Sequence, residues 1–164
     1  MDRNAYQSNL SPDEKVLMGI VRAAEIFKRA HAGVFKKHGL SFPQYNVLRV
    51  LEASANGRNM IGEVGRIMLV PGANMTGSAK RLERGGFILR KSDRRDERVT
   101  MLEITPKGKK TLGNIQKEKD AWLERMLEGF SQEEKLRLLH VVQRLIQKNV
   151  QFAGGGLSSP GKVA

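Results

Sequence analysis

The chain has 164 residues, of which 40% are hydrophobic, and its formal net charge is +12. The hydrophobic share excludes wholesale disorder, and the length suits one domain with its own core. The surplus of lysine and arginine indicates a polyanionic partner. Because the sequence contains no cysteine, disulfides and thiolate metal sites are excluded. No segment holds the ~20 apolar residues of a membrane span, so we expect a cytoplasmic protein without membrane contact.

The first 40 residues predict an arm followed by a long helix. Residues 1–10 are expected to form a flexible N-terminal arm. The sequence SPDE at 11–14 supplies a serine N-cap, a first-turn proline and a capping-box glutamate, so a helix begins there. Its apolar residues recur at helical spacing, and it is predicted to span about 12–38, before Gly39. This helix is longer than one compact head requires, so part of its apolar stripe is expected to pack elsewhere.

A second helix and a turn follow. Ser41 and Gln44 form another capping box. The helix behind this box is expected to turn three apolar residues inward: Val47, Leu48 and Leu51. The sequence SANG at 54–57 predicts a turn. Residues 59–60 can add a minimal third strand to a sheet further along the chain.

A helix-turn-helix is predicted in the middle of the chain. A short helical segment at 61–69 is broken by the sequence VPG at 70–72, because proline lacks an N–H and glycine is conformationally loose. A second helical segment runs to about Arg84. The two glycines at 85–86 then end it, as a left-handed C-cap requires.

A charged hairpin is predicted directly after these two helices. The β-like runs cover 87–91 and 99–104, and the polar tip 92–98 joins them. The tip mixes three arginines with three acids, which suits a loop lying against a minor groove or a phosphate backbone: Arg94, Arg95 and Arg98 with Asp93, Asp96 and Glu97. A helix, a tight turn, a helix and a hairpin form the outline of a winged helix-turn-helix.

The second helix of the motif has an apolar and a polar side at ~100° per residue. Three of its residues are expected to face inward: Met75, Ala79 and Leu82. The opposite side has small residues near its start and bases near its end, with polar flanks: Ala73, Gly77, Lys80, Arg81 and Arg84, flanked by Asn74, Thr76 and Ser78. A helix in a DNA major groove needs this order, with close approach at the base edges and cations at the phosphates. The alternative is an ordinary solvated surface.

Two more helices are predicted after the hairpin. Residues 105–106 cap the first, which is expected to end near Phe130, and SQEE at 131–134 opens the second with a capping box. The apolar stripe of the last helix is broader than the surface of a monomer needs. From Ala153 the composition changes to that of a flexible tail. We expect the terminal helices to form a two-fold dimer that sets two recognition helices ~34 Å apart. The alternative is a monomer whose terminal helices complete one core.

Catalysis has little support in the sequence. The three histidines, His31, His38 and His140, lie on separate helical stretches without a spaced carboxylate or cysteine, and we interpret them as surface or core-edge residues. No phosphate-binding loop, dinucleotide glycine pattern or nucleophile elbow occurs. Phe27 and Trp122 are interpreted as core residues, with a ligand pocket as the alternative. We therefore expect no enzyme activity, no cofactor and no metal site.

Several short motifs follow one another in a specific order and spacing: LSFPQYNVLRVL at 40–51, Thr76, Leu82-Glu83, GFILR at 86–90, DER at 96–98 and ITPKG at 104–108. In this order, from about Glu14 to Val150, the chain resembles the MarR family of bacterial transcription regulators. The resemblance implies a triangular dimer held by the N- and C-terminal helices on a pseudo-palindromic operator. It also implies release of the DNA when a small aromatic or phenolic effector binds between the dimerisation helices and the winged head.

The resemblance also suggests roles for single residues. It implies that Thr76 contacts DNA near the phosphates, that Asp96 and Arg98 shape the hairpin, and that the arginine reaches the backbone. Many members have an arginine where this chain has Glu97, so either Arg94 or Arg95 takes over that contact or the wing contacts less. Two further departures concern the recognition helix. Gly77 leaves base reading to Asn74, Ser78, Lys80 and Arg81, and Pro71 replaces the usual serine-like cap.

The sequence thus predicts a mainly α fold with a small β-wing (α+β). One domain is expected at 11–152, with a DNA-binding head at about 41–104 between dimerisation helices at about 12–38 and 105–150, and a tail at 153–164. The expected function is that of a sequence-specific, dimeric regulator of transcription, a repressor released by a small ligand. The alternative is a winged-helix module that binds protein partners, or nucleic acid without sequence choice.

Overall fold

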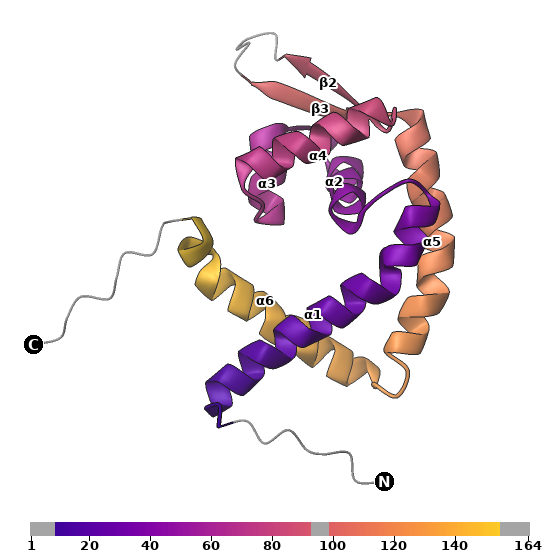
Figure 1. Cartoon of the computed structure of the whole chain (residues 1–164). Helices are drawn as coiled ribbons and strands as arrows, with labels where there is room; N and C mark the ends of the chain where they lie inside the picture. Colours follow the sequence, from indigo (N-terminus) through magenta and orange to yellow (C-terminus); the bar gives the residue numbers. More distant parts are fainter. Residues whose placement is uncertain (1–8, 93–98, 155–164) are drawn as a thin grey trace, which may run out of the picture.

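The fold is mainly helical with a small antiparallel sheet, as the sequence predicted (Figure 1). The computed structural model describes residues 9–92 and 99–154, with side chains up to 149. The predicted arm therefore lies almost wholly outside the described residues, as does most of the tail. The elements of the described residues are α1 (Pro12–Lys37), α2 (Phe42–Ala53), a 3₁₀ turn (Ala55–Gly57), β1 (Arg58–Met60), α3 (Ile61–Met68), α4 (Gly72–Arg84), β2 (Ile88–Ser92), β3 (Thr100–Ile104), α5 (Pro106–Met126) and α6 (Gln132–Gly154).

The three predicted capping boxes are present and fix the starts of α1, α2 and α6. In each box the serine hydroxyl accepts the N–H of the residue three positions on, at 3.2–3.4 Å. The side chain of that residue accepts the serine N–H in return, at 2.7–2.8 Å. Two otherwise unpaired N–H groups are thereby satisfied at each helix start. These boundaries are local, which is why the sequence alone located them.

The wing is a three-stranded antiparallel sheet in the order β1-β3-β2. The predicted third strand is confirmed, because Asn59 pairs with Leu102 and Met60 with Met101. The hairpin begins at Ile88, one residue later than predicted, since the Phe87 N–H still bonds to the Leu82 carbonyl at the end of α4. The sheet turns one face toward α2 and α4, and Ile88, Leu102 and Ile104 on that face are buried.

Most of the core lies in the head, between α2, α3, α4 and the inner face of the sheet. Every residue predicted to face inward from α2 and α4 is at most 1% exposed. The side chains at the centre of this core are all fully buried: Val47, Leu48, Leu51, Val64, Ala79, Leu82, Ile88 and Leu102. The same core cluster takes in Phe35 of α1 and Leu112 and Ile115 of α5, so the head shares its core with the adjoining parts of these two helices.

The joint between the wing and α5 is packed without spare space. The Thr105 hydroxyl lies 2.8 Å from the Gly86 carbonyl oxygen and accepts a hydrogen bond from the Gly108 N–H at 3.1 Å. A Cβ atom at Gly108 would collide with the Phe87 carbonyl oxygen and would lie 2.8 Å from the Ile104 side chain. Only a glycine fits this close approach of helix to sheet. The predicted cap at Thr105 is confirmed, and the wing leads into α5 through a rigid contact.

The terminal helices extend away from the head. Figure 1 shows α5 descending from the wing, while α1 and α6 cross beneath the head. The helix α5 ends at Met126 rather than near Phe130, because the chain turns there and Gly129 adopts φ +88°. The helix α6 continues to Gly154, so it includes the first two residues of the predicted tail. Among the described residues, no helix combines the length and apolar character that a membrane crossing needs.

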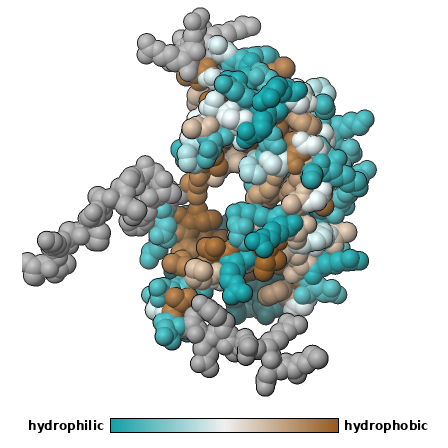
Figure 2. Space-filling view, in the orientation of Figure 1, coloured by the Kyte–Doolittle hydropathy of each residue, from teal (hydrophilic) through white to brown (hydrophobic). Residues whose placement is uncertain are grey.

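The apolar side chains of the two crossing helices are largely exposed. Val16, Leu17 and Val21 on α1 are 52–60% exposed, and Leu139 and Val141 on α6 are 53% and 56% exposed. No side chain described for 132–149 is buried. Figure 2 shows hydrophobic residues gathered in the region of these two helices. The predicted broad stripe of the last helix is therefore not covered by the part of the chain that the structure describes.

Candidate nucleic-acid interface

The turn between α3 and α4 is tight and partly strained. The helix α3 ends at Leu69, whose φ of 53° and ψ of 40° are left-handed. The Val70 N–H returns to the Gly65 carbonyl oxygen at 3.0 Å, which closes the turn. Pro71 occupies the N-cap of α4 and offers no side-chain acceptor. The first N–H groups of α4 are thus left without a side-chain cap, and they point the positive end of the helix dipole outward.

We expect Leu69→Gly to stabilise the protein by about 0.5–1 kcal/mol. A left-handed backbone costs an L-residue ~1–2 kcal/mol that glycine does not incur, although glycine loses more chain entropy on folding. The Leu69 side chain is 53% exposed, so little packing is lost. Urea denaturation at fixed protein concentration measures the change. Ile67→Gly is the control, because Ile67 is equally exposed but helical, and it should destabilise by ~1 kcal/mol. Equal losses in both variants would contradict the strain at Leu69.

The helix α4 presents the predicted side to solvent, with one exception. Five of the predicted DNA-binding residues are exposed: Asn74, Thr76, Lys80, Arg81 and Arg84. The expectation that Ser78 lies on an open flank is wrong, since Ser78 is only 8% exposed. Ser78 stands three residues after Met75 and four before Leu82, so it shares their inward face. The remaining polar side forms one continuous surface along the helix.

Gly77 gives Arg81 room to lie along the helix. A Cβ atom at Gly77 would be 3.7 Å from Arg81 Nη1, so the guanidinium extends back one turn toward the start of α4. The charge of Arg81 therefore sits over the middle of the recognition helix. At the edge of this surface, the Thr76 hydroxyl donates to the Gly72 carbonyl oxygen at 3.1 Å.

The cations of α4 are not neutralised by the described neighbours. Among the ion pairs of residues 9–92 and 99–149, none involves Lys80, Arg81 or Arg84. The one acid of α4, Glu83, is instead paired with Arg90 of β2 at 3.4 Å. The helix thus keeps its positive charge toward solvent. The predicted wing-tip residues lie outside the described residues: Arg94, Arg95, Asp96 and Arg98.

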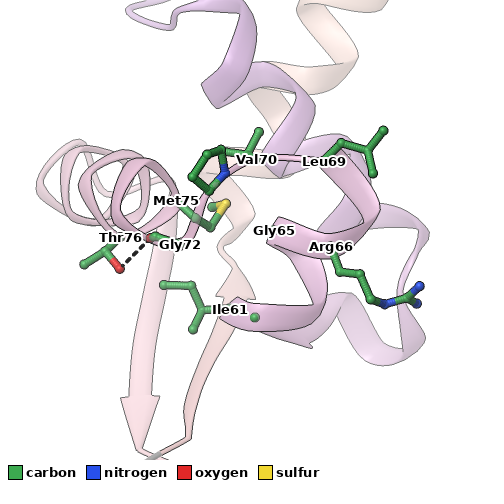
Figure 3. Close-up of a pocket in the computed structure, with 10 residues that line it drawn as sticks. Ile61, Gly65, Arg66, Leu69, Val70, Gly72, Met75 and Thr76 are labelled. Carbon is green, nitrogen blue, oxygen red and sulfur yellow. Dashed lines mark hydrogen bonds between the residues drawn. The ribbon is translucent and has the colours of Figure 1, made fainter. Parts of the chain in front are cut away.

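A cavity of about 740 Å³ opens between α3 and α4 (Figure 3). Its walls are mainly apolar and include Ile61, Val70 and Met75, while Arg66 and Thr76 stand at its edge. Three of the lining residues are glycines, at 62, 65 and 72. The cavity adjoins the uncapped start of α4 and therefore lies next to the recognition surface.

An aromatic cluster joins α1, α2 and α5 behind the head. His31 is fully buried at its centre, which corrects the interpretation of His31 as a surface or core-edge residue. Its ring centroid lies 4.2 Å from that of Phe27, 5.9 Å from that of Phe35 and 3.9 Å from that of Trp122. The spacing of Phe27, His31 and Phe35 at i, i+4 and i+8 was the available signal. Phe27 and Trp122 are only partly buried, and their ring centroids lie 6.4 Å apart edge to face, so the interpretation of both as core residues is wrong.

His31 leaves one polar atom without a partner. Its Nδ1 lies 2.9 Å from the Phe27 carbonyl oxygen. Because a carbonyl oxygen only accepts, Nδ1 carries the proton, and Nε2 is an acceptor. That Nε2 is buried and has no hydrogen-bond partner among the described residues. Such an orphaned atom is costly in a core and marks a place where a donor would be favourable. No group of three or more potential metal ligands occurs within the described parts of the chain.

Comparisons with known proteins agree with this architecture. The sequence profile of the family "Transcriptional regulator SarA/Rot" matches residues 31–115. The regulator TtmR of Methylorubrum extorquens is 32% identical over 115 residues, which are 70% of this chain and 58% of TtmR. Sco3205, a MarR family regulator of Streptomyces coelicolor solved in complex with DNA, has a TM-score of 0.76 and 16% identity over 91% of this chain and 94% of its own. NadR in complex with 4-hydroxyphenylacetate has a TM-score of 0.69 and 22% identity over 86% of this chain and 96% of its own.

The fold and these matches place the chain in the class of winged helix-turn-helix transcriptional regulators. The chain belongs to the MarR family of transcriptional regulators, as the order of its motifs predicted. Members of this family are regulators rather than enzymes, in agreement with the sequence.

Proposed function

We propose that the chain acts as a homodimer that represses transcription from a pseudo-palindromic operator and releases it when a small aromatic ligand binds. The observation that carries this proposal is the uncovered apolar surface of α1 and α6. Leucine, valine and isoleucine side chains on both helices are about half exposed in a single chain. Burying such surface contributes roughly 25 cal/mol per Å², and a second copy is the simplest cover.

The same observation weighs against the monomer alternative. A monomer would need the terminal helices to complete one core, and the described part of α6 contributes no buried side chain. The buried core instead joins the head to the adjoining parts of α1 and α5. Dimerisation through the terminal helices would leave both heads free, with their recognition helices ~34 Å apart on one face of DNA.

The two ends of the recognition helix α4 support two kinds of DNA contact. Small and uncharged polar residues stand near the start of α4, where base edges would be contacted. Cations that form no ion pair with the described residues follow toward its end. We propose that α4 binds DNA through five exposed residues: Asn74, Thr76, Lys80, Arg81 and Arg84. From the sequence we keep Arg94, Arg95, Asp96 and Arg98 as the wing contacts, and we omit the buried Ser78.

The aromatic cluster around His31 supports a ligand with a ring and a hydrogen-bond donor. The rings of Phe27 and Trp122 would stack on an aromatic ligand, and the buried Nε2 would accept its hydroxyl hydrogen. The cluster lies where α1 and α5 meet the first helix of the head. A ligand that prefers a conformer with displaced heads would lower operator affinity by its differential binding energy.

We expect His31→Phe to keep operator binding and lose the response to phenols. Phenylalanine preserves the aromatic stacking but lacks the acceptor at Nε2. The measurement is a gel shift with 4-hydroxyphenylacetate as the probe, because NadR was solved with this compound. The wild type should release DNA as the probe is added, and the variant should not. His140→Phe at an exposed position is the control and should respond like the wild type. An unchanged response of His31→Phe would remove His31 from the ligand site.

Gel shifts and footprints on the DNA that flanks the gene test the proposed function itself. A sequence-specific dimer should protect two half-sites about one helical turn apart and should bind random DNA 10³-fold or more weakly. Sedimentation at micromolar concentration should give two chains. Equal binding to flanking and random DNA would favour the alternative of a non-specific nucleic-acid-binding module. A single-chain particle would contradict the dimer.

A further inference from the structure

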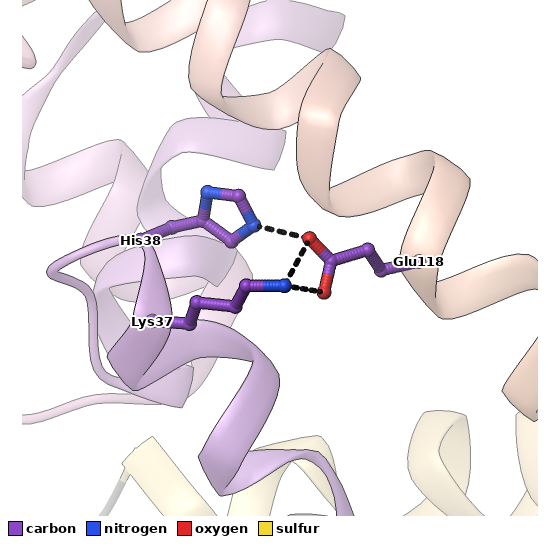
Figure 4. A network of polar contacts seen from close by, with 3 residues as sticks. All are labelled: Lys37, His38 and Glu118. Carbon is purple, nitrogen blue, oxygen red and sulfur yellow. Dashed lines mark hydrogen bonds and ion pairs between the residues drawn. The ribbon is translucent and has the colours of Figure 1, made fainter.

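One carboxylate connects the end of α1 to the middle of α5. Lys37 Nζ donates to the two oxygens of Glu118 at 3.1 and 3.2 Å, and His38 Nε2 donates to Oε1 at 3.0 Å (Figure 4). The donors are 81 and 80 positions away from Glu118 in the sequence. We call these three residues, Lys37, His38 and Glu118, the α1–α5 clamp.

The clamp sits where the head joins the terminal helices. His38 is the C-cap of α1, and the next residue, Gly39, adopts φ +72° and redirects the chain into the head. The helix α5 leaves the same head directly after β3, at Pro106. The chain thus enters the head after α1 and leaves it into α5. Glu118 on α5 binds the end of α1, so it links the two connections.

The clamp is also next to the aromatic cluster. Trp122 follows Glu118 by one helical turn, and His31 precedes His38 by two turns, so the contacts share one α1–α5 interface. The ring centroids of His31 and Trp122 are only 3.9 Å apart. Any group inserted between these rings would have to separate α1 from α5, and the clamp is the nearest described polar contact that resists this separation.

The exposure of the clamp favours a role in orienting the two helices over a role in stabilising the fold. The side chains of Lys37 and Glu118 are 68% and 36% exposed, and exposed ion pairs contribute little to folding. His38, however, is only 17% exposed and is held by the end of α1. Hydrogen bonds from Lys37 and then His38 hold the pKa of Glu118 below its usual value. The carboxylate therefore remains charged and can hold both donors at neutral pH.

We propose that Glu118 is a positioning residue that sets the angle between α1 and α5, the two helices that connect to the DNA-binding head, and thereby the orientation of the head. By holding Lys37 and His38 it narrows the range of head orientations and so raises operator affinity. It is also the contact that a ligand in the aromatic cluster has to loosen. The ligand part of this inference rests on the proposed function, whereas the orientation part concerns contacts within one chain.

The test compares Glu118→Gln with Glu124→Gln in the full-length protein. Glutamine preserves the shape of Glu118 but removes its charge. Glu124 is an exposed acid on the same helix without an ion pair among the described residues, so it matches the charge change. Hydrogen exchange of the amides at 34–40 should accelerate in Glu118→Gln only. The midpoint of thermal unfolding should stay within about 2 °C in both variants.

The orientation of the heads is measured in the same variants. Because the chain has no cysteine, Ala53→Cys places a single spin label on the exposed surface of α2. Pulsed electron resonance on the dimer should give a broader head-to-head distance distribution for Glu118→Gln than for Glu124→Gln. Operator affinity should fall about two- to fivefold in Glu118→Gln alone. The double variant Lys37→Glu with Glu118→Lys should restore both quantities.

The outcomes separate this inference from the proposed function. Unchanged amide exchange at 34–40 in Glu118→Gln overturns the clamp, whatever the protein binds. A wild type without a second chain or without operator preference overturns the proposed function, while the exchange experiment still decides on the clamp. Faster exchange with unaltered distances and affinity would make the clamp a local contact only and would also overturn its positioning role.

Discussion

Leu139→Glu is expected to convert the protein into a monomer and to weaken operator binding at least ~100-fold. Leu139 is 53% exposed in the single chain, so a carboxylate there remains solvated and the monomer should fold. In a dimer formed through α6, the same carboxylate would be buried against apolar side chains without a partner, which costs several kcal/mol. A monomer holds only one recognition helix, and it loses the gain of ~10²–10⁴ that linked binding provides.

Sedimentation velocity and gel shifts on the operator measure this prediction. Gln147→Glu is the matched control, because it adds the same charge on the polar side of α6. The control should remain dimeric and bind as the wild type does. Circular dichroism should show that Leu139→Glu keeps its helices. A dimeric Leu139→Glu with intact operator binding would place the dimer interface elsewhere on the chain.

Arg81→Ala is expected to weaken specific DNA binding by ~1–3 kcal/mol, which is about 5- to 150-fold. The Arg81 guanidinium lies over Gly77, at the middle of the recognition helix, and has no ion pair among the described residues. A base contact would relax the sequence preference at one base pair. A phosphate contact would instead weaken binding to all sequences and lower the slope of log K against log salt by about one.

Binding titrations over a range of salt concentrations, on the operator and on single-base variants of it, distinguish the two contacts. Arg144→Ala is the control, since it removes the same charge from the exposed surface of α6, away from the head. The control should leave both the sequence preference and the salt slope unchanged. No change in either quantity for Arg81→Ala would exclude Arg81 from the interface.

The elements that could be predicted from the sequence are those with local causes. Capping boxes, the break at Val70-Pro71 and the helical period of α4 depend on residues within four positions of each other. Their boundaries were therefore correct to within a residue or two. The end of α5 was predicted four residues too late, because apolar residues continue at helical spacing through Leu127 to Phe130. The turn with Gly129 ended the helix there despite the pattern.

The contacts that could not be predicted join distant parts of the chain. The burial of His31 depends on Trp122 from α5, and the clamp joins residues about 80 positions apart. Neither pairing has a periodic signal in the sequence. Ser78 was misplaced for a different reason, since a flank at ~100° per residue is close to the buried face and a small hydroxyl fits there. The DNA contacts themselves remain predictions.

The close fit of Gly108 against Phe87 determines where the protein can bend. Because helix and sheet touch there without a gap, the wing and the first half of α5 have to move as one rigid body. The opposite corner, where the chain passes Gly39 between α1 and α2, is held by the α1–α5 clamp, so rotation at this corner needs the clamp to open. We expect a ligand that reorients the heads to act by rotation about this corner. Both recognition helices would then tilt about a hinge that lies on the opposite side of the head from the wing.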